Sequence, residues 1–270
     1  MDMHLANKTA LVTGSSSGIG ASIARTLAKE GVTVVLHGRS EKRTNEVAEA
    51  IRAEGAIAHV ALGDLSTDGG AAAVVEATRS ALHSAPEILV NNAGGGGIPR
   101  SWESGSLEDW HQSFEQNIFS AVRLMTAFTP ELKAKGWGRV INIAAGWSIS
   151  PGTVMPYYSA AKSALINTTV SLAQEFAGTG ITVNTLSPGP IHTPALERVV
   201  RGLAAQFNWG TDDWGEIERR FARDIVSTLT GRIGRVEEVA SAVTFLASPL
   251  SDFITAAHLR VDGGAIRSIL

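Results

Sequence analysis

The sequence has 270 residues and no cysteine. Disulfide bonds, thiolate catalysis and cysteine-ligated metal sites are therefore excluded, although this absence does not fix a cellular compartment. The seven histidines are scattered along the chain, and no two of them stand at the spacing of metal ligands. We therefore expect no metal site.

Long apolar runs and a strong excess of one charge are also absent. No apolar stretch approaches the ~20 residues that a membrane-spanning helix needs. The net charge of −3 gives no reason to expect nucleic acid or an anionic membrane as a partner. The polar residues 1–8 pass directly into a strand pattern, so no signal peptide is expected. These absences favour a cytoplasmic protein with a small-molecule partner.

Seven short apolar runs alternate with helical patterns along the chain. Strands are expected at residues 9–13, 33–36, 57–62, 88–91, 139–143, 181–186 and 258–262, and helices near 18–31, 41–54, 70–83, 107–132 and 159–176. This alternation predicts an α/β fold: one domain over residues 1–270, with a doubly wound, Rossmann-like parallel sheet of about seven strands and helices on both faces. Such sheets bind ligands at the carboxyl ends of their strands.

The first strand ends in a glycine-rich turn that opens a helix. Backbone amides of such a turn and the helix N-terminus suit a phosphate group. The expected nucleotide contacts are Gly14, Ser16, Ser17, Gly18, Ile19 and Gly20. The turn also matches Gly-x-Ser-x-Gly, the elbow of serine hydrolases, with Ser16 as the nucleophile. Against this alternative, the elbow would lie on the first strand, and no earlier strand could supply an oxyanion loop.

The second strand ends at Gly38-Arg39, roughly 20 residues beyond the glycine turn. NAD-preferring sites usually carry a carboxylate here for the ribose 2′-hydroxyl. Its absence, together with the Arg39 guanidinium, suits a 2′-phosphate, so NADP is favoured over NAD. Arg39 could instead be a solvated loop residue. Ser40 and Glu41 fit a helix N-cap and first turn, so Glu41 is not expected to bind the ribose.

Other strand ends carry small or polar residues that belong at the same sheet edge. These are Asp64, Leu65, Asn91, Ala93, Gly94, Pro188 and Gly189. Residues 94–97 are four consecutive glycines, which predict a loop too flexible to act as a support. It is expected as a hinge beside the cofactor or as a surface loop.

Tyr158 and Lys162 stand four residues apart in a segment that favours a helix, so their side chains project about 40° apart on one face. A lysine ammonium beside a phenol favours the phenolate, so we expect a lowered pKa for Tyr158. The pair suits proton exchange with a carbonyl or alcohol. Asn117 lies within a helical stretch, where asparagine costs some helix propensity, which points to a specific role.

Taken together, these segments resemble the short-chain dehydrogenase/reductase family over essentially the whole chain, nearest its 3-oxoacyl-carrier-protein reductase-like members. The matching segments are 13–20, 91–94, 158–162, 187–193, 231–234 and 261–264.

The resemblance implies an NAD(P)-dependent carbonyl reductase or alcohol dehydrogenase and a homotetramer. It implies that Tyr158 donates the proton, that Lys162 lowers its pKa and holds the nicotinamide ribose, and that Asn117 binds a relay water. Cofactor contacts are implied for Gly14, Ile19, Asp64, Asn91, Gly94, Gly189 and Thr193, with Ile191 in the same segment.

One position departs from the family pattern. Ala145 stands 13 residues before Tyr158, where the family usually has a catalytic serine. Three readings stay open: Ser148 reaches in from its loop, turnover is impaired in a protein that still binds cofactor, or the alanine was engineered. The ordinary interpretation of Ser148 is a loop hydroxyl.

A substrate lid is expected at about residues 194–230. Phe207, Trp209 and Trp214 in this segment, with Trp102 and Trp147 in other loops, indicate an apolar or aromatic carbonyl substrate.

Overall fold

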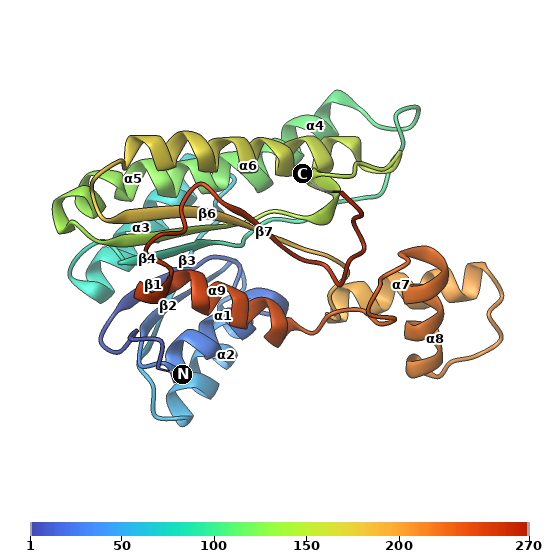
Figure 1. Ribbon diagram of the computed structural model, residues 1–270, viewed down its shortest axis with the longest axis horizontal. Helices are drawn as coiled ribbons and strands as arrows, with labels where there is room; N and C mark the ends of the chain where they lie inside the picture. The colour runs from blue at the N-terminus through green and yellow to red at the C-terminus, as the bar shows by residue number, and fades with distance from the viewer. Residues whose placement is uncertain (1, 269–270) are drawn as a thin grey trace.

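The computed structural model describes residues 2–268, and its centre is a seven-stranded parallel sheet (Figure 1). The strands are β1 (Thr9–Val12), β2 (Thr33–Gly38), β3 (Ala58–Leu62), β4 (Ile88–Asn91), β5 (Gly138–Ile143), β6 (Ile181–Pro188) and β7 (His258–Val261). Their order across the sheet is β3-β2-β1-β4-β5-β6-β7. The predicted doubly wound α/β fold is confirmed, and each strand begins and ends within two residues of its predicted bounds.

Helices join consecutive strands. They are α1 (Gly18–Lys29), α2 (Glu41–Ala53), α3 (Asp68–Leu82), α4 (Leu107–Phe114), α5 (Ser120–Lys135), α6 (Pro156–Glu175), α7 (Pro194–Gln206), α8 (Trp214–Arg220) and α9 (Val236–Ala247). Figure 1 shows α1, α2 and α9 on one face of the sheet and α3, α5 and α6 on the other, while α7 and α8 project beyond one edge. Within residues 2–268, no helix is long and apolar enough to cross a membrane.

Two hydrophobic cores follow from the two-residue period of the strands. In β1, Ala10 and Val12 pack into the core under α1, α2 and α9, whereas Leu11 faces the core under α3, α5 and α6. Because both faces are covered, β4, β5 and β6 are buried over their whole length, which explains why such runs read as continuous apolar stretches.

The chain winds outward from β1 to β3, then returns to β4 on the other side of β1. The carboxyl ends of β1 and β4 therefore border the topological switch point at which open α/β sheets bind ligands. All residues predicted from strand ends lie along the edge of the sheet that the carboxyl ends of the strands form.

The stretch predicted as one helix over 107–132 differs in its middle. Residues Glu115–Phe119 form a π-helical turn between α4 and α5, and Asn117 lies within it. Single π turns inside α-helices occur frequently at functional sites, because they redirect a side chain while the helix continues.

Candidate active site

A cavity of about 270 Å³ opens at the carboxyl ends of β1 to β4. Eight predicted residues line it: Gly14, Ser16, Ser17, Arg39, Asp64, Leu65, Ala93 and Gly94. Sequence reasoning missed His37, Arg43, Ser66, Gln116 and Ser120, which line it too. A larger cavity of about 500 Å³ lies at the opposite sheet edge, near the start of β2. The smaller cavity is the candidate site because the strands end there.

The glycine turn is closely packed, which fits a nucleotide cradle. A Cβ on Gly14, whose φ is +64°, would lie 3.0 Å from the Ala93 Cα. A Cβ on Gly20 would lie 2.5 Å from the Gly14 carbonyl oxygen. Side chains at these positions would collide with neighbouring backbone and displace the turn, so glycine at both positions keeps the turn in the shape that suits a phosphate.

Gly38 and two arginines form the side of the cavity near β2. A Cβ on Gly38 would lie only 2.3 Å from the Thr44 Oγ1, so this position has no room for a carboxylate side chain. Arg39 is exposed and lies 3.9 Å from an Asp64 oxygen, and Arg43 lines the same cavity from the first turn of α2. This side of the cavity has two guanidinium groups and no room for a carboxylate at Gly38, which suits the binding of a phosphate monoester.

The segment after β6 approaches the start of α1. Pro188 ends β6, Ile191 is buried, and Thr193 is the N-cap of α7. A Cβ on Gly18 would lie 3.4 Å from the Thr193 methyl group, whereas Gly189 packs against Asp262 in the segment after β7. Of these predicted residues, the structure brings Thr193 and Gly18 together.

Asn91 does not point into the cavity. It is buried, and its Nδ2 donates to the Asn142 Oδ1 at 2.8 Å, across the β4–β5 register. Asn92, which was not singled out, donates instead to the Thr13 carbonyl oxygen at 2.8 Å and so ties the glycine turn to β4. A cofactor contact of Asn91 would therefore have to use its backbone.

Tyr158 and Lys162 both lie on α6, as predicted. The Lys162 Nζ is 6.0 Å from the centre of the Tyr158 ring and donates to the Ile143 carbonyl oxygen at 2.8 Å. Lys162 is buried, whereas Tyr158 keeps part of its surface accessible. Among residues 2–268 the Tyr158 hydroxyl has no hydrogen-bond partner, so it is free to meet a ligand.

The expected lowering of the Tyr158 pKa is wrong for the protein alone. Burial raises the pKa of Tyr158 to about 12 and lowers the pKa of Lys162 to about 8. Each charged form loses solvation, so both groups shift toward neutrality. Since Lys162 is already neutral at the pH where the phenol would ionise, its charge is absent when it would favour the phenolate.

Asn117 is buried and fastens the start of the glycine loop. Its Oδ1 accepts from the Gly95 N–H at 3.0 Å, and its Nδ2 donates to the carbonyl oxygens of Gly95 and Ser113 at 3.0 and 2.9 Å. A Cβ on Gly94 would lie 2.4 Å from the same Oδ1 and 3.2 Å from the Lys162 Nζ. The expectation of a loop too flexible to act as a support is therefore wrong for its first two residues.

Ala145 follows β5, and Ser148 ends the short 3-10 turn Gly146–Ser148. The Ser148 Oγ donates to the Ala145 carbonyl oxygen at 2.5 Å, and the Ser163 Oγ donates to the Ser148 carbonyl oxygen at 2.7 Å. The only donor hydrogen of the Ser148 hydroxyl is therefore in use.

The segment predicted as a lid has its own small hydrophobic core, to which Trp209 and Trp214 contribute. Trp214 stacks on His192 with ring centroids 4.9 Å apart, and His192 is paired with Glu197 at 3.0 Å. Trp102, in contrast, is 68% exposed. Trp209 and Trp214 therefore pack within the protein, which removes two of the indications for an apolar substrate.

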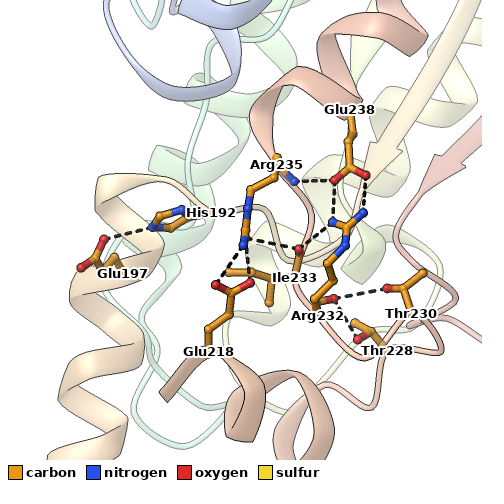
Figure 2. A network of polar contacts seen from close by, with 9 residues as sticks. All are labelled: His192, Glu197, Glu218, Thr228, Thr230, Arg232, Ile233, Arg235 and Glu238. Atoms are coloured by element: carbon orange, nitrogen blue, oxygen red, sulfur yellow. Dashed lines mark hydrogen bonds and ion pairs between the residues drawn. The ribbon is translucent and has the colours of Figure 1, made fainter. Parts of the chain in front are cut away.

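Paired charges attach α8 to the start of α9, as Figure 2 shows. The Arg235 guanidinium contacts both oxygens of the buried Glu218 at 2.7 and 3.1 Å. Arg232 contacts both oxygens of Glu238 at 2.8 and 2.6 Å. The Arg235–Glu218 pair therefore fastens α8 to the start of α9, and the Arg232–Glu238 pair connects the segment before α9 to its first turn.

Comparisons with known proteins agree with this geometry. The profile of the short chain dehydrogenase family matches residues 8–203. A protein of Bacillus subtilis named "Uncharacterized oxidoreductase YvaG" is 38% identical over the full length of both chains. The crystal structure of L-sorbose reductase from Gluconobacter frateurii, complexed with NADPH and L-sorbose, has a TM-score of 0.93 at 33% identity and covers all of both chains.

A 3-oxoacyl (acyl-carrier-protein) reductase from Agrobacterium tumefaciens with NADP bound has a TM-score of 0.84 at 35% identity, over 97% of this chain and 96% of that one. The family profile covers well over half of the chain, and these relatives match nearly all of it. The chain therefore belongs to the short-chain dehydrogenase/reductase family and is an NAD(P)-dependent oxidoreductase.

Proposed function

We propose that the protein is an NADPH-preferring reductase of ketones or aldehydes that can also run as an alcohol dehydrogenase. The observation that carries the proposal is the nucleotide cavity with its two arginines at the same sheet edge as the accessible Tyr158 hydroxyl. When bound, the nicotinamide exchanges the hydride with the substrate carbon. The chain supplies position and the proton.

The preference for NADPH rests on the β2 end of the cavity. Arg39 and Arg43 would bind the 2′-phosphate, and the closed space at Gly38 excludes the carboxylate that an NAD site uses. The other residues proposed to hold the cofactor are Gly14, Ser16, Ser17, Gly18, Ile19, Gly20, Asp64, Leu65, Asn91, Ala93, Gly94, Tyr158, Lys162, Pro188, Gly189, Ile191 and Thr193.

Tyr158 would donate its phenolic proton to the carbonyl oxygen during reduction and take it back during oxidation. Lys162, charged below its pKa of about 8, would hold the nicotinamide ribose, and its charge, 6.0 Å from the centre of the Tyr158 ring, would stabilise the phenolate that remains once the proton has been given up. Asn117 would fix the Gly94–Gly95 backbone beside Lys162. A relay water at Asn117 would have to use the remaining lone pair of its Oδ1 or the backbone of the π turn.

Ala145 supports a second candidate, a cofactor-binding family member with slow turnover. A hydroxyl at this position would donate to the developing substrate oxyanion, and the loss of one such donor costs about 10²–10³ in turnover. Ser148 is a weak replacement because its hydrogen already serves the Ala145 carbonyl oxygen. Ala145→Ser should raise kcat by about a hundredfold, and an equal kcat in both proteins would show that another group supplies the donor.

The serine-hydrolase alternative is set aside by the family assignment. The geometry agrees, because both ring nitrogens of His37, which lines the same cavity as Ser16, are already paired with backbone groups. His37 therefore cannot act as the general base that activates a nucleophilic serine.

We also propose that the segment of about residues 194–230 acts as a substrate lid. We further propose that the protein forms a homotetramer. Exposed apolar side chains support assembly. Phe253 is fully exposed, and Leu250, Leu259 in β7, Phe119 before α5 and Val170 on α6 are exposed as well. Light scattering during size-exclusion chromatography measures the assembly directly, and a monomer at micromolar concentration would reject it.

A substrate panel with NADPH and NADH tests the reaction and its cofactor together. The panel pairs small polar ketoses, including L-sorbose, with bulky apolar ketones and aldehydes. Cofactor oxidation followed by absorbance should be faster with NADPH for any accepted carbonyl. Faster rates with ketoses than with apolar ketones would reject the apolar-substrate interpretation, and equal or faster rates with NADH would reject the NADPH preference.

A further inference from the structure

The imidazole of His37 spans two walls of the nucleotide cavity. His37 is the next-to-last residue of β2 and is buried, and it lines the cavity together with Arg39 and Asp64. The Gly14 N–H lies 3.0 Å from its Nδ1, and the Gly63 carbonyl oxygen lies 3.1 Å from its Nε2. One ring therefore joins the turn after β1 to the end of β3.

These two partners fix the proton on the ring. A backbone N–H only donates and a carbonyl oxygen only accepts, so Nδ1 must be unprotonated and Nε2 must carry the hydrogen. A second proton on Nδ1 would oppose the Gly14 N–H and break that contact. Burial, assisted by the Arg39 charge, lowers the pKa of His37, which agrees with a neutral ring.

The backbone of His37 strengthens the same connection. Its N–H donates to the Ser15 Oγ at 2.9 Å, and its carbonyl oxygen accepts from the Ser15 N–H at 2.9 Å. Gly14 has little room to shift, because it packs against Ala93 at a positive φ. The position of the first glycine of the turn is therefore coupled to the ring.

We propose that His37 is a positioning residue for the nicotinamide cofactor: its neutral ring holds the glycine turn at a fixed distance from the end of β3. This inference rests on the proposed cofactor site. Protonation of the ring should weaken cofactor binding. The charge of Arg39 opposes protonation of the ring, whereas that of Asp64 favours it. Arg43 lines the same cavity. Hydrogen bonds from Ser66 lower the pKa of Asp64, so this carboxylate stays ionised at mildly acidic pH.

Three variants separate the two ring contacts. His37→Asn places an amide oxygen near the Nδ1 position and keeps an acceptor for Gly14. His37→Gln reaches the Nε2 position and keeps a donor for Gly63. His37→Phe removes both contacts. The matched control is His59→Asn, which changes a partly buried histidine of the neighbouring strand β3 outside the cavity.

The readout is the dissociation constant of NADPH at pH 8, measured by quenching of tryptophan fluorescence. Loss of one neutral hydrogen bond corresponds to about a two- to tenfold change in Kd. We expect this weakening for His37→Asn and for His37→Gln, a larger one for His37→Phe, and no change for His59→Asn. Circular dichroism tests whether each variant folds. If His37→Phe does not fold, the Kd values of His37→Asn and His37→Gln decide the outcome.

A pH series provides a readout that a purely structural role would not move. It uses NADH, because a 2′-phosphate titrates near pH ~6 itself. Because burial lowers the pKa of His37 below its usual 6.5, the wild-type Kd should be constant above that pH and rise only below it, whereas that of His37→Asn should stay flat throughout. Parallel pH curves, or Kd values of all His37 variants within twofold of wild type, would overturn the inference. A wild-type protein that binds neither NADPH nor NADH would instead overturn the proposed function.

Discussion

Gly38→Ala tests whether the closed end of β2 is a real steric constraint. The added Cβ would lie 2.3 Å from the Thr44 Oγ1 and 3.0 Å from the Ser16 Cβ. Overpacking of a tightly packed site costs about 1–3 kcal/mol. In a domain of this size each kcal/mol lowers Tm by about 2–4 °C, so the melting temperature should fall by roughly 2–12 °C.

Three further variants make this test specific. Thr44→Ala removes the clashing oxygen, so the double variant should lose less stability than the sum of the two single variants. Gly69→Ala is the matched control: this α3 glycine has nothing within 4 Å of the added Cβ, and alanine should stabilise it by about 0.4–1 kcal/mol. Denaturant unfolding of the four variants and the wild type measures these differences. Wild-type stability of Gly38→Ala, or strict additivity with Thr44→Ala, would refute the reasoning.

Three other predictions concern charge. Arg39→Ala should raise the Kd of NADPH by about 10–100-fold and leave that of NADH within about twofold, as titration calorimetry can measure. Lys162→Met should abolish turnover yet raise the Tm of the apo-protein. Burial lowers the pKa of Lys162 to about 8, which corresponds to a destabilisation of the fold by roughly 3 kcal/mol below that pH. In thermal melts from pH 8 to 10.5, the Tm gain of the variant should shrink. Glu238, whose pKa falls to about 2 through its hydrogen bonds with Arg232, stabilises the fold above about pH 4.5. That contribution is lost toward pH 2, so acid unfolding of Glu238→Gln should depend less on pH.

The strands and the cavity edge were predictable because their signals are local. A buried parallel strand reads as a short apolar run that ends in glycine or a polar residue, and seven such runs gave the sheet. The glycine turn, Arg39 and Asp64 each follow a strand directly. Topology then brings these ends together, so position along the chain was sufficient to place them in one cavity.

What was missed depends on contacts between segments distant in sequence. Asn91 pairs with Asn142 in the register of β4 and β5, which no local pattern reveals. The π turn around Asn117 interrupts a sequence with ordinary helical periodicity. The spacing of Tyr158 and Lys162 gave their shared face, but their pKa shifts arise from burial by the surrounding fold. The spacing of the two residues therefore identified the reacting pair, but it could not predict the pKa shifts of its members.

Arg43 and His37 carried weaker local signals. Arg43 lies in the first turn of the helix that Ser40 caps. The expectation that this helix end borders the cavity would have identified Arg43 as a candidate. His37 precedes Gly38 within the strand and reads as one more buried position. Only its two backbone partners reveal why a polar ring is there.

Turnover of Tyr158→Phe beside the wild type tests the central claim most directly. The assay follows NADPH oxidation at saturating carbonyl substrate, with the NADPH Kd measured on the same samples. We expect the variant to bind NADPH within about threefold of wild type and to lose about 10²–10⁴ in kcat, the scale of a general acid. A variant that keeps wild-type kcat would show that another group delivers the proton, and would contradict the account.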